Sequence, residues 1–186
     1  MSLRIAIHID GVLANPESEV LQAETIENFW ESLNEIESGI VSRLAPIAAQ
    51  RRWEIIFLTT RQPSLGAIPQ IQSQRWLESK GFVLPSVYVA PGPRGRIAAA
   101  LGLDLVIDGS PEHCVDVVEN SDARAILVWR GDRTALPVEA RRPEINIVKS
   151  AGECLDMLTA VEEPDPEQAG FLARVKRMLG LKESRA

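Results

Sequence analysis

The sequence has few cysteines, no long hydrophobic run and no excess of positive charge, and each absence excludes a class of protein. Its two cysteines, Cys114 and Cys154, have no metal-ligand spacing, so we expect free thiols in a reducing cytoplasm. No apolar stretch approaches the roughly 18 residues of a transmembrane helix, and the first is interrupted at His8 and Asp10, unlike a signal peptide. A net charge of −6 argues against general nucleic-acid binding. We therefore expect a cytoplasmic protein with no transmembrane segment and no nucleic-acid partner.

The rest of the composition is that of a soluble globular protein, with 45% hydrophobic and 25% charged residues in a chain of 186. Apolar strand-like runs alternate with segments of helical periodicity, which predicts an α/β fold with a parallel sheet and helices on both faces. We expect strands at 5–9, 54–58, 86–90, 103–107, 123–129 and 146–148. We expect helices at 16–38, 40–51, 71–80 and 151–161, a helix that the turn at 91–96 opens and that runs through 101, and a further helix containing 115–118.

Polar residues follow several of these strands at the point where each leaves the sheet. His8 and Asp10 end the first strand, and Asp108 ends the fourth. In open α/β sheets the ligand crevice lies outside the carboxyl ends of the strands, so these side chains are candidate site residues. A glycine-rich turn carrying Arg94 and Arg96 opens a helix, which is an arrangement that attracts anions.

These strand ends, taken in order, resemble the four motifs of the haloacid dehalogenase-like (HAD-like) phosphohydrolases. The stretch from His8 to Asn15 is similar to the first motif of the nucleotidase-like branch, Asp-x-Asp-Gly-Val-x-x-x-Asn. The resemblance covers roughly residues 3–160 and implies a three-layer fold. It also implies that the Thr59 hydroxyl and the backbone N–H of Thr60 bind a phosphoryl oxygen, as donors at a strand end can.

The resemblance assigns two further roles. Arg94, with Arg96 as the alternative, would stand where the family has a phosphate-steadying lysine, and Asp108 would be a metal ligand. Arginine keeps the charge of lysine but replaces a compact ammonium with a broad planar fork.

Two departures from the family pattern concern the chemistry itself. His8 stands where the family has its nucleophilic aspartate, and Gly109 replaces the second acid of the fourth motif. Mg²⁺ prefers oxygen ligands to imidazole nitrogen, so we expect any Mg²⁺ to bind weakly. The metal-dependent phosphatase reaction is therefore predicted to be lost while the fold is kept.

Three functions remain open. The first is a binding or regulatory protein that takes a phosphorylated small molecule or a nucleotide. The second is an active hydrolase or phosphotransferase that uses His8 together with Asp10, which lies two residues further along the same strand face. In the first case His8 is a neutral histidine hydrogen-bonded within the pocket.

The third function places the activity at the end of the chain. We expect a HAD-like domain over 1–161, with a short cap or plain surface insertion at 16–40. An acidic linker begins the segment 162–186, and an amphipathic basic helix over 168–182 would contact a protein partner or pack on its own domain.

Overall fold

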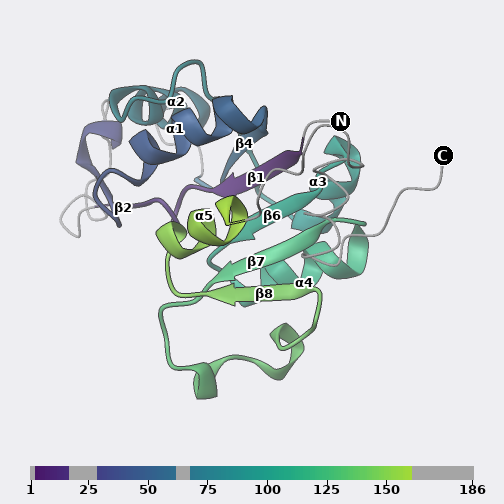
Figure 1. Ribbon diagram of the computed structural model, residues 1–186. Helices are drawn as coiled ribbons and strands as arrows, with labels where there is room; N and C mark the ends of the chain where they lie inside the picture. The colour runs from purple at the N-terminus through teal and green to yellow at the C-terminus, as the bar shows by residue number, and fades with distance from the viewer. Residues whose placement is uncertain (1–2, 17–28, 62–67, 161–186) are drawn as a thin grey trace, which may run out of the picture.

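The computed structural model describes residues 3–16, 29–61 and 68–160, and its centre is a six-stranded parallel sheet (Figure 1). The strand order is β5-β4-β1-β6-β7-β8, so β1 lies in the middle with β4 and β6 beside it. The strands are β1 (Arg4–His8), β4 (Glu54–Thr59), β5 (Ser86–Val89), β6 (Leu105–Asp108), β7 (Arg124–Val128) and β8 (Ile145–Val148). The predicted parallel sheet is confirmed, with each strand within a few residues of its expected position.

Five α-helices cover the two faces of the sheet (Figure 1). The face that receives Ile5 and Ile7 of β1 packs against α1, α2 and α5, whereas Ala6 belongs to the core formed with α3 and α4. Alternate residues of a strand point to opposite faces, and this explains why one strand contributes to both cores. The helices are α1 (Ile40–Arg51), α2 (Pro69–Ser79), α3 (Arg94–Leu101), α4 (Pro111–Asn120) and α5 (Ala151–Thr159). In the described part of the chain no helix has the length and apolarity to cross a membrane.

The connection between β7 and β8 is the longest described segment without an α-helix or a strand. Two short 3₁₀ helices, η3 (Arg133–Ala135) and η4 (Val138–Ala140), lie within it. Leu136 and Ala140 are buried in the core that contains α4, so this segment is packed onto the domain. The segment is mostly polar in sequence, and the structure shows that Leu136 and Ala140 attach it to the core.

The helix predicted over 16–38 is wrong for the part that the structure describes. Residues Ala14–Pro16 form β2, which pairs antiparallel with β3 (Leu33–Glu35), and the 3₁₀ helix η2 (Phe29–Ser32) comes directly before β3. The insertion therefore leaves and re-enters the domain through a two-stranded ribbon. Its residues 17–28 lie outside the described chain.

Two acidic residues in the described end of this segment, 29–38, make contacts that an α-helix continuing to Gly39 would not allow. Glu35 accepts hydrogen bonds from the backbone N–H groups of Gly39 (2.9 Å) and Val41 (3.1 Å), at the start of α1. Glu37 accepts bonds from two N–H groups at the start of α5, at 2.6 and 2.8 Å. The first N–H groups of a helix have no partner within it, so these carboxylates satisfy donors that would otherwise lack one.

The segment after α5 lies outside the described residues from 161 onward. The acidic linker and the amphipathic helix over 168–182 are therefore predictions that this structure does not address, and so is the division of the chain at 161.

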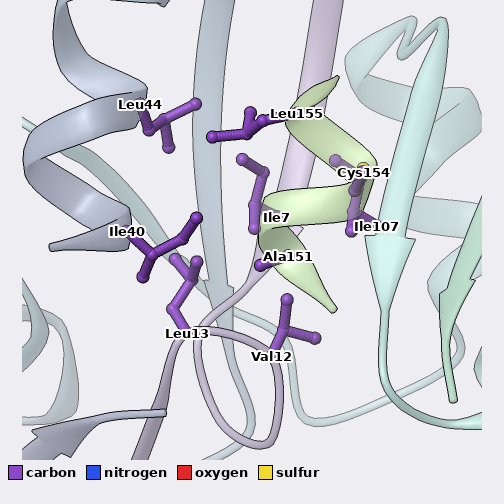
Figure 2. Close-up of a pocket in the computed structure, with 9 residues that line it drawn as sticks. All are labelled: Ile7, Val12, Leu13, Ile40, Leu44, Ile107, Ala151, Cys154 and Leu155. Carbon is purple, nitrogen blue, oxygen red and sulfur yellow. The ribbon is translucent and has the colours of Figure 1, made fainter. Parts of the chain in front are cut away.

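A small cavity lies in the core between β1, α1 and α5 (Figure 2). Its volume is about 10 Å³, and Ile7, Leu44 and Leu155 point into it from those three elements. Such a volume is at the lower limit for a single water molecule, and the lining is almost entirely apolar. The cavity is a packing feature of the core and not a ligand site.

Candidate active site

His8, Arg94 and Asp108 meet at the carboxyl end of the sheet, although they come from three separate elements. Parallel pairing of β1 with β6 places Ile7 opposite Ile107, so the residues that follow them are also neighbours. His8 Nδ1 lies 3.4 Å from Asp108 Oδ1, and Arg94 Nε lies 3.4 Å from Asp108 Oδ2. Arg94 Nη2 lies 3.3 Å from His8 Nε2, which closes the triangle. All three residues are buried, with exposed fractions of 6%, 1% and 0% in that order.

A fourth residue of the site, His113, is one that the sequence reasoning missed. It is the third residue of α4, and its Nδ1 lies 3.1 Å from Asp108 Oδ2. Ser110 caps the helix, because its side-chain oxygen accepts a hydrogen bond from the backbone N–H of His113 at 3.3 Å. This cap fixes the start of α4 and with it the position of His113. The sequence did offer a sign of its role: the chain has only two histidines, and the second lies shortly after Asp108, at the start of the following helix.

Asp108 has its acceptor capacity filled by protein donors. Oδ1 accepts from the backbone N–H of Ser110 at 2.9 Å and faces His8, while Oδ2 faces His113 and Arg94. An ionised carboxylate offers about four acceptor sites, and four donors meet it here. Burial alone raises the pKa of the Asp108 carboxyl, but the hydrogen bonds from His113 and His8 outweigh burial and hold this pKa well below its ordinary value. Asp108 is therefore an anion in the folded protein.

The same contacts determine which nitrogen of His8 carries a proton. An anionic Asp108 only accepts hydrogen bonds, so His8 Nδ1 is the donor in that contact. Arginine has no acceptor, so His8 Nε2 accepts from Arg94. Both ring nitrogens of His8 are thus engaged inside the site, one by Asp108 and one by the buried Arg94 guanidinium.

Asp10 belongs to a second cluster, which lies beside the first. Its Oδ2 accepts a hydrogen bond from the Thr59 hydroxyl at 2.8 Å, and its Oδ1 pairs with the guanidinium of Arg61. The Thr59 oxygen also accepts the backbone N–H of Arg61 at 3.3 Å. Within the described residues Asp10 makes no hydrogen bond to His8, although the two lie close in sequence.

The remaining predicted residues lie outside these two clusters. Thr60 is half-buried just beyond β4, and Arg96 is exposed on the first turn of α3. Of the two candidate arginines, the structure brings Arg94 to His8 and Asp108.

Gly109 allows two loops to approach each other closely. A Cβ atom at this position would lie 3.3 Å from the carbonyl oxygen of Gly11, tighter than most such contacts. Arg130, a residue that the sequence reasoning missed, donates to that carbonyl at 2.6 Å and to the carbonyl of Val12 at 3.3 Å. Gly109 therefore allows the loop at Gly11 to lie close to the end of β6.

The fit of these residues to Mg²⁺ is poor. His8, Asp108 and His113 could each offer one ligand atom, and the three atoms lie within 4.8 Å of one another. Two of these are imidazole nitrogens, whereas Mg²⁺ requires oxygen ligands. The third is the carboxylate already filled by four donors, one of them the cationic Arg94. The described residues of this site are therefore not suited to hold Mg²⁺ for catalysis.

Comparison with known proteins shows the fold. No family model and no curated protein matches the sequence. Among solved structures, the chain is similar to a D,D-heptose 1,7-bisphosphate phosphatase from Burkholderia thailandensis, with a TM-score of 0.53 and 12% identity, covering 85% of this chain and 99% of that one. A de novo designed Rossmann 3x3 protein matches with a TM-score of 0.41, 14% identity, and coverage of 89% and 99%; at that score it carries no argument. The chain therefore shares the fold of that phosphatase, a parallel sheet with helices on both faces, as the alternation of strands and helices predicts.

Proposed function

We propose that this HAD-like domain binds a phosphorylated small molecule or nucleotide and does not carry out metal-dependent phosphohydrolysis. The observation that carries the proposal is the contact of Arg94 with both His8 and Asp108. The buried guanidinium of Arg94 thus contacts His8, at the nucleophile position of the resemblance, and Asp108, at its metal position. The metal-dependent reaction needs a carboxylate nucleophile and an open set of oxygen ligands, and neither is available.

Binding of an anion is supported by the cluster around Asp10. Thr59 and Arg61 present a hydroxyl and a guanidinium at the end of β4, where they hold the Asp10 carboxylate. A phosphate group offers the same donors more oxygen acceptors and more charge. We propose that the ligand phosphate competes with Asp10 for Thr59 and Arg61, with the Thr60 N–H as a further donor.

The positive charges near this position act in two different ways. We propose that Arg94, which is buried, contributes to ligand binding through its positive charge, and that Arg96, which is exposed, contacts the anion directly. The solved heptose bisphosphate phosphatase is named for a phosphorylated sugar, which agrees with a small phosphorylated ligand for this fold. Asp10, in this proposal, is the residue that yields its place to the ligand.

The direct test is a hydrolysis assay. Wild-type protein should show no Mg²⁺-dependent hydrolysis of nucleoside monophosphates or generic phosphomonoesters. The combined change His8→Asp and Gly109→Asp should produce a slow enzyme, because it restores both missing acids. Neither change alone should suffice, since nucleophile and metal act as one unit. The tight contact of a Cβ at Gly109 with the Gly11 carbonyl is a further reason to expect a low rate.

The contrary result is equally recognisable. A wild-type turnover of about 1 per second is an ordinary enzymatic rate. If such a rate were seen and were lost in both His8→Ala and Asp10→Asn, His8 would be a working catalytic group. The non-hydrolysing proposal would then be wrong.

A partner role for residues 168–182 is a separate proposal. Deletion of residues 168–186 should leave ligand binding by the domain unchanged and abolish any protein interaction made through the helix. Loss of ligand binding on this deletion would instead assign the tail to the domain.

A further inference from the structure

His113 presents one side of its ring to the protein and the other to the surface. Nδ1 faces Asp108, which is fully buried, while the side chain of His113 as a whole is 31% exposed. The two nitrogens lie on diverging sides of an imidazole ring, so the exposed part is the edge that carries Nε2. Among the described residues no hydrogen bond is made to this Nε2.

The contact with Asp108 determines which tautomer of His113 can act. An anionic Asp108 only accepts hydrogen bonds, so Nδ1 donates in this contact, and in that tautomer the lone pair lies on Nε2. A buried carboxylate that holds one nitrogen of a histidine also orients the ring. His8 differs, because Arg94 occupies its second nitrogen.

We propose that His113 is the nucleophilic residue of this pocket, with Nε2 accepting a phosphoryl group from a donor that contains a phosphorus–nitrogen bond. Asp108 is the positioning residue. The position of His113 in the first turn of α4 places an attached phosphoryl group near the positive end of the helix. This inference is independent of the ligand proposal above, which depends on Thr59 and Arg61.

The step balances without a metal or an external base. The Nε2 lone pair forms a bond to phosphorus, the phosphorus–nitrogen bond of zwitterionic phosphoramidate breaks, and its nitrogen, which already carries three protons, leaves as ammonia with the electron pair of that bond. The ring becomes positively charged because Nδ1 keeps its proton. The Asp108 carboxylate, 3.1 Å away, offsets this charge as it develops.

The test uses the full-length protein with potassium phosphoramidate as the donor. Peptide mapping by mass spectrometry under alkaline conditions follows the phosphoryl group on each of the two histidines. We expect His113 to be labelled at least about tenfold faster than His8, and about tenfold faster in the folded protein than in the same chain unfolded in urea. The unfolded chain is the matched control, because it has the same two residues without the Asp108 contact.

Two variants sharpen the result. His113→Gln should remove the fast label entirely. Asp108→Asn should reduce labelling of His113 to the rate of the unfolded chain, and circular dichroism would show whether that variant is folded. If it is not, the comparison of folded and unfolded wild type still decides the matter. Faster labelling of His8, or labelling of His113 at the same rate in both states, would overturn the proposal.

Discussion

The two carboxylates at the carboxyl end of the sheet are placed in opposite circumstances. Asp108 is fully buried and meets four donors, among them two histidines and an arginine. Asp10 has a side chain that is 23% exposed, and it is held by Thr59 and Arg61 at the rim. Asp108 therefore organises the interior of the site, and Asp10 holds two donors closer to the surface.

This difference shows that two carboxylates at one edge of a sheet can have different roles. In the buried cluster, two histidines and an arginine of the chain itself surround the Asp108 carboxylate. The folding stability therefore depends on every member of this cluster, because removing any one of them would leave another polar group buried without its partner. The rim cluster has a weaker dependence, since the side chains of Arg61 and Asp10 are 13% and 23% exposed and water partly solvates them, although Thr59 is buried.

The largest expected effect is on folding stability. Asp108→Asn would leave the buried Arg94 without its carboxylate, and this kind of change costs about 3–5 kcal/mol. Asp10→Asn, at the rim, should cost about 1 kcal/mol. Urea denaturation of both variants at neutral pH measures the two free energies of unfolding. Equal values for the pair would show that the buried cluster has no special weight.

A smaller effect should appear in the pH dependence of stability. The pKa of Asp108 is lowered on folding, so its contribution is fully present above the unfolded value of about 4 and declines as the pH falls below it. The urea midpoint of wild type should therefore fall more steeply between neutral pH and about pH 3 than that of Asp108→Asn. Parallel curves for the two proteins would contradict the assigned charge of Asp108.

The smallest effect concerns the ligand. Asp10→Asn removes the charge that competes for Thr59 and Arg61, so inorganic phosphate should bind about tenfold more tightly, equivalent to about 1.4 kcal/mol. Calorimetry with wild type and variant measures the change. Adding Thr59→Val to the variant should reverse the gain, because the hydroxyl donor is then lost. Weaker phosphate binding in Asp10→Asn would argue that Asp10 supports the ligand.

Much of the architecture could be predicted because it depends on local patterns. Continuous apolar runs define the buried strands, and the helix beginning at Ile40 follows Gly39 as expected. The meeting of His8 with Asp108 follows from parallel pairing of neighbouring strands. These features need no knowledge of how distant side chains choose their partners.

The features that were missed depend on tertiary contacts. Residues 29–38 do not form the predicted α-helix, and Glu35 and Glu37 there bind the starts of two different helices. His113 joins the site only because its helix starts with that residue facing Asp108. Likewise, Asp10 pairs with Arg61, although its sequence position suggested His8 as its neighbour.

The most direct test of the central claim, that Arg94 and two histidines stand in place of a metal, is a calorimetric titration of the wild-type protein with Mg²⁺. The account predicts affinity no tighter than millimolar, equivalent to about 4 kcal/mol or less. Micromolar affinity that disappears in a folded Asp108→Asn variant would contradict it.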